Sequence, residues 1–206
     1  MLRTAANLAG AACLGYVAGT IPSADVAARL ATDGAVDLRT AGSGNPGGAN
    51  AVAVLGKWWG AAVIAADVAK AVAASVAGRR LAGDAGAHLA GVASVVGHSY
   101  PIWSSGERGG KGVACAAGQL AATFPAAAPV EIAVAGLMAK AASKDRARKA
   151  TIAAVTAWMV ASIVWWRRGL PNLWGPRPTA ALPLAAAASG AVVVARFAAG
   201  RTTAPT

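Results

Sequence analysis

Charged residues are scarce in this sequence, and acidic residues are the scarcest. Only 13% of the 206 residues are charged, with 8 Asp and Glu against 19 Lys and Arg, whereas soluble domains carry about 25%. Hydrophobic residues make up 56% of the chain, and the mean hydropathy is +0.52. This composition predicts an integral membrane protein, because a single soluble domain of this length needs more polar surface. An alanine-rich soluble helical bundle is the alternative, since alanine is only weakly hydrophobic.

Cysteine is nearly absent, and this excludes a disulfide framework. The two cysteines, Cys13 and Cys115, both lie in apolar runs. No spacing of His, Cys and carboxylate residues matches a metal site, so we expect no metal and no other cofactor. The net charge of +11 would suit a nucleic-acid partner. The cations, however, lie in short loops between apolar runs, so we expect contact with membrane lipids and no nucleic acid.

Aromatic residues are few, at 5%, but seven of them are tryptophans. Most of these lie near the ends of apolar runs, as in the aromatic belts of membrane proteins; they are Trp58, Trp59, Trp103, Trp165, Trp166 and Trp174. A helix needs about 20 apolar residues to cross a bilayer. The sequence therefore predicts an all-α, polytopic membrane protein that forms a single domain over residues 1–206.

About seven transmembrane helices are expected. The segment after Arg3 resembles a signal peptide, but its length predicts a retained first helix. Pro125 and Pro129 divide the long run 112–140 into two helices, because proline cannot continue a helix. A strongly basic loop, 141–149, follows. The expected helices are 4–24, 51–77, 85–97, two within 112–140, 150–166 and 179–195.

Two glycine-rich stretches, 38–50 (LRTAGSGNPGGAN) and 97–112 (GHSYPIWSSGERGGKG), interrupt the apolar runs. Successive backbone amides in such turns can form an anion-binding nest. The stretches also supply polar side chains that suit phosphate oxygens; these are Arg39, Ser43, Asn45, Asn50, His98, Arg108 and Lys111. Gly112 follows Lys111, so the P-loop pattern is not matched and nucleotide binding is disfavoured. We expect one phosphate-binding site at a membrane face.

The positive-inside rule gives the orientation. With seven spans and the N-terminus outside, twice as many Lys and Arg residues fall on the inner side as on the outer side. Both glycine-rich stretches then face the cytoplasm.

The sequence leaves the roles of two further pairs of residues undecided. Asp67 and Lys70 lie three residues apart on one face of an expected span, which predicts a structural ion pair or, alternatively, a direct role in the site. Ser43 is a candidate nucleophile with His98 as its base. No carboxylate that would orient His98 is evident, since only Glu107 is near in sequence.

The stretches together resemble the bacterial membrane glycerol-3-phosphate acyltransferases of the PlsY family. The resemblance rests on RTAGSGNPGGAN at 39–50, GHSYP at 97–101 and GGKGVA at 109–114, supported by GYVAGTIP at 15–22 and DVAK at 67–70. It implies transfer of an acyl group from acyl phosphate to glycerol 3-phosphate in the bacterial cell membrane. The product is lysophosphatidic acid, an intermediate of phospholipid biosynthesis.

The expected catalytic residues are Ser43, His98 and Lys111. The expected substrate-binding residues are Arg39, Gly44, Asn45, Gly47, Asn50, Arg108, Gly109, Gly110 and Gly112.

The sequence departs from the family near its C-terminus. Of the pattern R-H-x-x-N, only Arg196 is present; Phe197 and Gly200 stand where the family has His and Asn. This departure leaves open a catalytically inactive relative that binds a phosphate or anionic lipid. A small membrane transporter is another alternative, because broken helices and the ionisable pair Asp67 and Lys70 are compatible with one.

Overall fold

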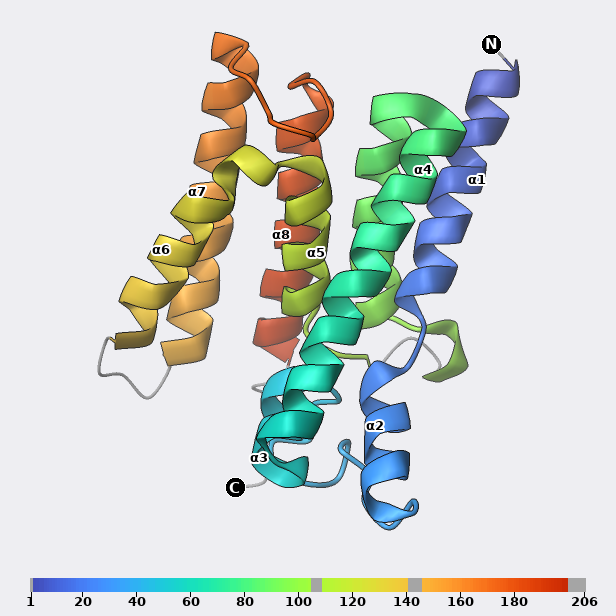
Figure 1. The fold of residues 1–206 in the computed structure, drawn as a ribbon, viewed down its shortest axis with the longest axis vertical. Coiled ribbons are helices and arrows are strands. Elements are labelled where there is room, and N and C mark those ends of the chain that lie inside the picture. The colour runs from blue at the N-terminus through green and yellow to red at the C-terminus, as the bar shows by residue number, and fades with distance from the viewer. Residues whose placement is uncertain (1, 105–108, 141–145, 200–206) are drawn as a thin grey trace.

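The computed structural model describes residues 2–104, 109–140 and 146–199, and every regular element in these ranges is a helix (Figure 1). The elements in chain order are α1 (Leu2–Gly19), α2 (Ser23–Thr32), α3 (Gly48–Leu55), α4 (Lys57–Ser99), η1 (Ile102–Ser104), α5 (Val113–Thr123), η2 (Pro125–Ala127), α6 (Ala128–Lys140), α7 (Arg146–Arg168) and α8 (Ala181–Ala199).

Helix α4 is a hairpin of two antiparallel arms. Its backbone leaves helical geometry at Ala82 and at Gly83, where φ is +67°, and the chain then runs back along itself (Figure 1). The arms are in close contact, because a Cβ atom at Gly78 or Gly86 would overlap the carbonyl oxygen of the other residue. The predicted turn between two helices is confirmed.

Small residues let α1 pack directly on the second arm of α4. A Cβ atom at Gly15 would overlap the backbone of Ala90, and one at Gly19 would overlap that of Ser94. Close backbone approach through small residues is typical of helices packed in membranes. This seam continues to Gly97, which lies against the carbonyl of Tyr16 at the end where the glycine-rich stretches lie.

Two expected boundaries near the first glycine-rich stretch are wrong. The expected helices leave residues 25–50 as a connecting loop, but Pro22 is followed by helix α2. This helix has Asp25 in its first turn, where the helix dipole favours an acidic side chain. The expected helix 51–77 is divided at Gly56, where φ is +90°. Such a conformation strains any residue other than glycine.

The proline break is confirmed, and the start of α7 is corrected. Helices α5 and α6 meet at an angle of 112° across Phe124 and Pro125. Helix α7 begins at Arg146, so part of the expected basic loop is helical. The rest of that loop, residues 141–145, lies outside the described residues.

The all-α membrane class is confirmed, whereas the number of spans stays a prediction. In the described part of the chain, four helical segments are long and apolar enough to cross a membrane, and the bent α5–α6 pair would be a fifth. One of the four is α4, which folds back on itself. With 11 and 13 residues, α5 and α6 are each shorter than the roughly 20 residues of a complete span. Seven spans and an external N-terminus are therefore still expectations.

Candidate active site

The two glycine-rich stretches lie at the same end of the helical bundle and line one cavity of about 870 Å³. The first stretch contributes Arg39 and Pro46, and the second contributes His98 and Gly110. The junction between α1 and α2, residues 19–25, forms another wall. The volume of the cavity is within the range of small-molecule binding sites. The structure thus brings together two segments that are some 50 residues apart in the sequence.

Asn50 holds the first stretch in shape. Its buried side-chain oxygen accepts a 2.8 Å hydrogen bond from the backbone amide of Ser43, and its amide nitrogen donates to the carbonyls of Leu38 and Ala41 at 3.0 Å. These bonds stabilise a turn in which Gly42 has a φ of +60°. The polar atoms of the Asn50 side chain are therefore hydrogen-bonded to the loop backbone, which favours a positioning role over contact with phosphate.

The other predicted residues of the first stretch also form the loop. Gly44 has a φ of +68°, and Gly47 lies so close to the side chain of Asn45 that a Cβ atom there would come within 2.8 Å of the amide nitrogen. Ser43 is exposed and does not line the cavity. Within the described ranges, no hydrogen bond joins the Ser43 hydroxyl to His98, so the geometry gives no support to a Ser–His pair.

Arg39 faces the cavity from a fixed position. Its guanidinium binds both carboxylate oxygens of Asp25, one of them at 2.8 Å. The hydrogen bond to Asp25 raises the pKa of Arg39 above its usual value, so the cation is permanent. A guanidinium has five N–H donors, so some remain for a bound anion. Asp25 lies on α2, the helix that was not expected from the sequence.

Glycines bring the second stretch against the end of α4. A Cβ atom at Gly109 would overlap the carbonyl of Ser99, and one at Gly110 would overlap Nε2 of His98. Gly112 has a φ of +80° and precedes the first turn of α5. The expected binding residue Arg108 lies outside the described residues.

The C-terminal helix α8 holds the second stretch in place. Arg196 donates hydrogen bonds to the carbonyls of Gly109 and Gly110. The ammonium group of Lys111 lies 4.4 Å from the centre of the Phe197 ring, a cation–π contact. Burial lowers the pKa of Lys111, and the charge of Arg196 lowers it further. Phe197, which stands where the resemblance predicts a histidine, thus contacts the cation of the glycine-rich stretch.

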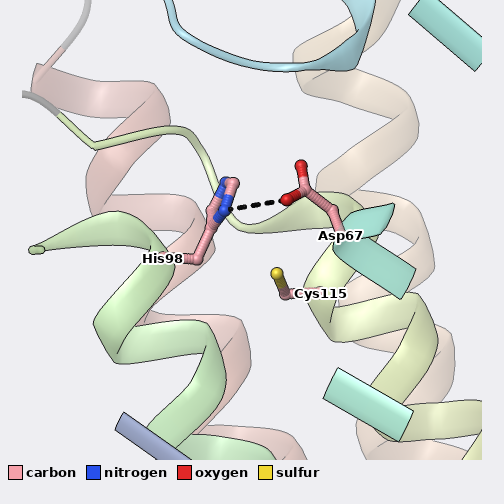
Figure 2. Close-up of side chains that lie close together, drawn as sticks. All are labelled: Asp67, His98 and Cys115. Atoms are coloured by element: carbon pink, nitrogen blue, oxygen red, sulfur yellow. Dashed lines mark ion pairs between the residues drawn. The ribbon is translucent and has the colours of Figure 1, made fainter. Parts of the chain in front are cut away.

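His98 lies beside a buried ion pair. Asp67 and Lys70, both on the first arm of α4, are 2.8 Å apart, as expected for a structural pair. Nδ1 of His98, at the end of the second arm, is 3.1 Å from the ammonium of Lys70. The same nitrogen is 3.5 Å from Asp67, and Figure 2 shows these two side chains facing each other. The expectation that no carboxylate accompanies His98 is therefore wrong. Sequence proximity could not reveal Asp67, because only the hairpin of α4 brings the two arms together.

The same place offers three metal-binding side chains. Donor atoms of Asp67, His98 and Cys115 lie within 4.8 Å of one another (Figure 2). The ammonium group of Lys70, however, contacts both Asp67 and His98. A metal ion would have to displace this cation, so the arrangement does not fit a metal site.

Comparison with known proteins identifies the family. Residues 9–200 match the glycerol-3-phosphate acyltransferase family. The chain belongs to this family. A glycerol-3-phosphate acyltransferase of Myxococcus xanthus is 39% identical over 175 residues, which cover 76% of this chain and 90% of the relative. One from Anaeromyxobacter sp. is 40% identical over 147 residues, or 69% of each chain.

Solved structures of PlsY, an integral membrane glycerol 3-phosphate acyltransferase, share the fold. Its glycerol 3-phosphate form has a TM-score of 0.71 and 28% identity, and covers 94% of this chain and 90% of its own. Its lysophosphatidic acid form has a TM-score of 0.73, also at 28% identity, with 95% and 90% covered. The predicted class, a membrane acyltransferase of phospholipid synthesis, is confirmed.

Asn50→Ala should destabilise this acyltransferase by about 1–3 kcal/mol, because it removes three hydrogen bonds and leaves the buried carbonyl of Leu38 unpaired. Thr40→Ala is the matched control, because it removes one exposed hydrogen bond from the same loop, and we expect a change within about 0.5 kcal/mol. Denaturant unfolding in micelles measures both. Equal stability of the two variants would show that Asn50 does not organise the loop.

Proposed function

We propose that this protein transfers a fatty acyl group from acyl phosphate to a hydroxyl of glycerol 3-phosphate, giving lysophosphatidic acid and inorganic phosphate. The observation that carries the proposal is the single cavity lined by both glycine-rich stretches, with Arg39 and His98 at its wall. Two phosphate groups take part in this reaction. The cavity has the size and the hydrogen-bond donors for such anions.

The chemistry needs little covalent help, because acyl phosphate is an activated mixed anhydride. The glycerol hydroxyl oxygen attacks the acyl carbon, and the bond from that carbon to the phosphate oxygen breaks. The hydroxyl proton passes to the departing phosphate. The protein's contribution is to align the substrates and to stabilise negative charge. Arg39 and His98 at the cavity wall, together with Lys111 of the second stretch, have this role.

An apolar pocket of about 370 Å³ supports an acyl substrate. It begins at Val113, the second residue after Lys111, and is walled by α5, α6, α7 and α8. Leu120 and Trp158 are among its lining residues. A fatty acyl chain can lie there while its phosphate occupies the glycine-rich stretch.

We place the site at the cytoplasmic face of the bacterial cell membrane. The support is the excess of Lys and Arg on the side that holds the glycine-rich stretches, which is the cytoplasmic side by the positive-inside rule. Glycerol 3-phosphate is a charged, water-soluble substrate, so a site at an aqueous face also suits it.

The test is turnover by the purified protein in detergent with acyl phosphate and labelled glycerol 3-phosphate. We expect labelled lysophosphatidic acid to form, and acyl-coenzyme A in place of acyl phosphate to give none. A folded protein that binds glycerol 3-phosphate but forms no product would overturn the proposal. That result would favour an inactive relative, in keeping with Phe197 in place of the family's histidine.

A further inference from the structure

The ammonium group of Lys70 has three polar neighbours. It donates to the carbonyl of Ile21 at 2.8 Å, contacts the carboxylate of Asp67 at 2.8 Å and lies 3.1 Å from Nδ1 of His98. Lys70 is 8% exposed and Asp67 is 2% exposed. Buried charges in a membrane are costly and usually pair or serve a function. The ion pair with Lys70 explains why the buried charge of Asp67 is tolerated. It does not explain why Lys70 also contacts His98.

This contact favours one of the two neutral forms of His98, which differ in the ring nitrogen that carries the proton. An ammonium group has donors and no acceptor, so Nδ1 must be the acceptor of the hydrogen bond. A neutral imidazole that accepts at Nδ1 carries its proton on Nε2. The alternative, Nδ1–H donating to Asp67, has the longer separation of 3.5 Å.

The other side of the ring faces the cavity. His98 lines it together with Gly109 and Gly110. Nε2 lies so close to Gly110 that a Cβ atom there would overlap it. The proton on Nε2 is therefore presented next to the glycine-rich stretch, where an oxyanion would lie.

The geometry points to Lys70 and Asp67 as positioning residues that fix His98 in its Nε2–H form, so that His98 donates a hydrogen bond to a phosphate oxygen and does not act as a base. The phosphate ligand in this statement rests on the proposed function. The same ammonium group binds the carbonyl of Ile21, which belongs to the α1–α2 wall of the cavity. Lys70 thus fixes the proton of His98 and one wall of its cavity together.

Nitrogen-15 NMR of the full chain in micelles, with labelled histidine, tests the assignment directly. The chain has two histidines, His88 and His98, so a His98→Gln variant assigns both sets of signals. We expect His98 at neutral pH to show a protonated Nε2 and an unprotonated Nδ1. Added inorganic phosphate or glycerol 3-phosphate should shift its Nε2–H signal and leave His88 unchanged. A protonated Nδ1 in the parent protein would overturn the inference.

Variants of Lys70 separate proton positioning from packing. Lys70→Gln retains an N–H donor, so we expect it to keep the Nε2–H form, whereas Lys70→Met should lose the preference. Lys70→Met should also lower kcat/KM for glycerol 3-phosphate by about 10- to 100-fold, with partial recovery in Lys70→Gln. Lys57→Met is the matched control: Lys57 begins the same helix, is exposed, and contacts the ring of Trp58. Its effect should be within twofold.

If Lys70→Met alone fails to fold, the double variant Asp67→Asn/Lys70→Met leaves no unpaired buried charge and is measured in its place. An unchanged histidine spectrum in either variant would overturn the inference. Failure of the proposed function is distinguishable, because the tautomer is measured without turnover. A protein with the expected spectrum that makes no lysophosphatidic acid would refute the activity and leave the positioning role standing.

Discussion

Lys111→Ala is expected to reduce lysophosphatidic acid formation by about 100- to 1,000-fold. Removing one preorganised group that stabilises developing negative charge typically has an effect of this size. Lys111 lies between Gly110 and Gly112, and its ammonium is held over the ring of Phe197. Alanine removes the charge and leaves the glycine backbone in place, so the loss should appear in turnover and hardly at all in stability.

Initial rates with acyl phosphate and labelled glycerol 3-phosphate check this expectation, with Lys57→Ala as the control for loss of a lysine. Thermal unfolding of both variants tests whether they are folded. Turnover of Lys111→Ala within tenfold of the parent would remove Lys111 from the catalytic residues.

The dependence of activity on pH is a second test of the role of the Lys111 charge. Burial and the charge of Arg196 lower its pKa from the usual 10.5. The cation is therefore lost at a lower pH than for an exposed lysine, and activity should fall as the pH rises toward that point. In Lys111→Arg the charge persists, so its remaining activity should not show this alkaline decline. The same decline in both proteins would assign it to another group.

Gly110→Ala is the second change with a large expected effect, at least about 100-fold in kcat/KM. The new Cβ atom would overlap Nε2 of His98 and would lie 3.0 Å from the carbonyl oxygen of Pro46. The loop or the imidazole must therefore move, and a displacement of about 1 Å at a reacting centre can cost 100-fold. This substitution tests the fit of the two glycine-rich stretches without removing a charge.

Gly136→Ala is the matched control, because a Cβ atom at Gly136 meets nothing within 4 Å. It lies within α6, where alanine favours the helix by about 0.5–1 kcal/mol over glycine. Steady-state kinetics and thermal unfolding should show a stable and active Gly136→Ala beside a stable but impaired Gly110→Ala. Full activity of Gly110→Ala would mean that the loop does not need its close approach to His98.

Prolines and glycines that interrupt helices made much of the fold predictable from sequence. Pro125 and Pro129 predicted the bend between α5 and α6, because a proline within a helix removes a hydrogen bond and clashes with the preceding turn. Local signals were weaker around Pro22 and Gly56. Helix α2 has 10 residues, fewer than three turns, so its periodic pattern is too short to distinguish it clearly from a loop. One glycine can be tolerated within a helix or can end it.

The glycine-rich stretches were recognisable from sequence as a candidate phosphate site, because such a site needs backbone amides, small residues and cations close together in the chain. The spacing of Asp67 and Lys70 also predicted their pairing, since residues three apart share a helical face. The sequence could not assign tasks within a stretch. Asn50 and Ser43 both belong to the first stretch. Asn50 is buried and its side chain forms hydrogen bonds to the loop backbone, whereas Ser43 is exposed.

The sequence by itself determined the membrane class, the helical fold and the two stretches of the site, because each depends on local composition and spacing. Only the tertiary structure decided the partners: Asp25 for Arg39, Phe197 for Lys111, and the Asp67–Lys70 pair for His98. These partners lie on different helices or on opposite arms of a hairpin. Their contacts depend on how small residues let the helices approach, and no local pattern encodes that distance.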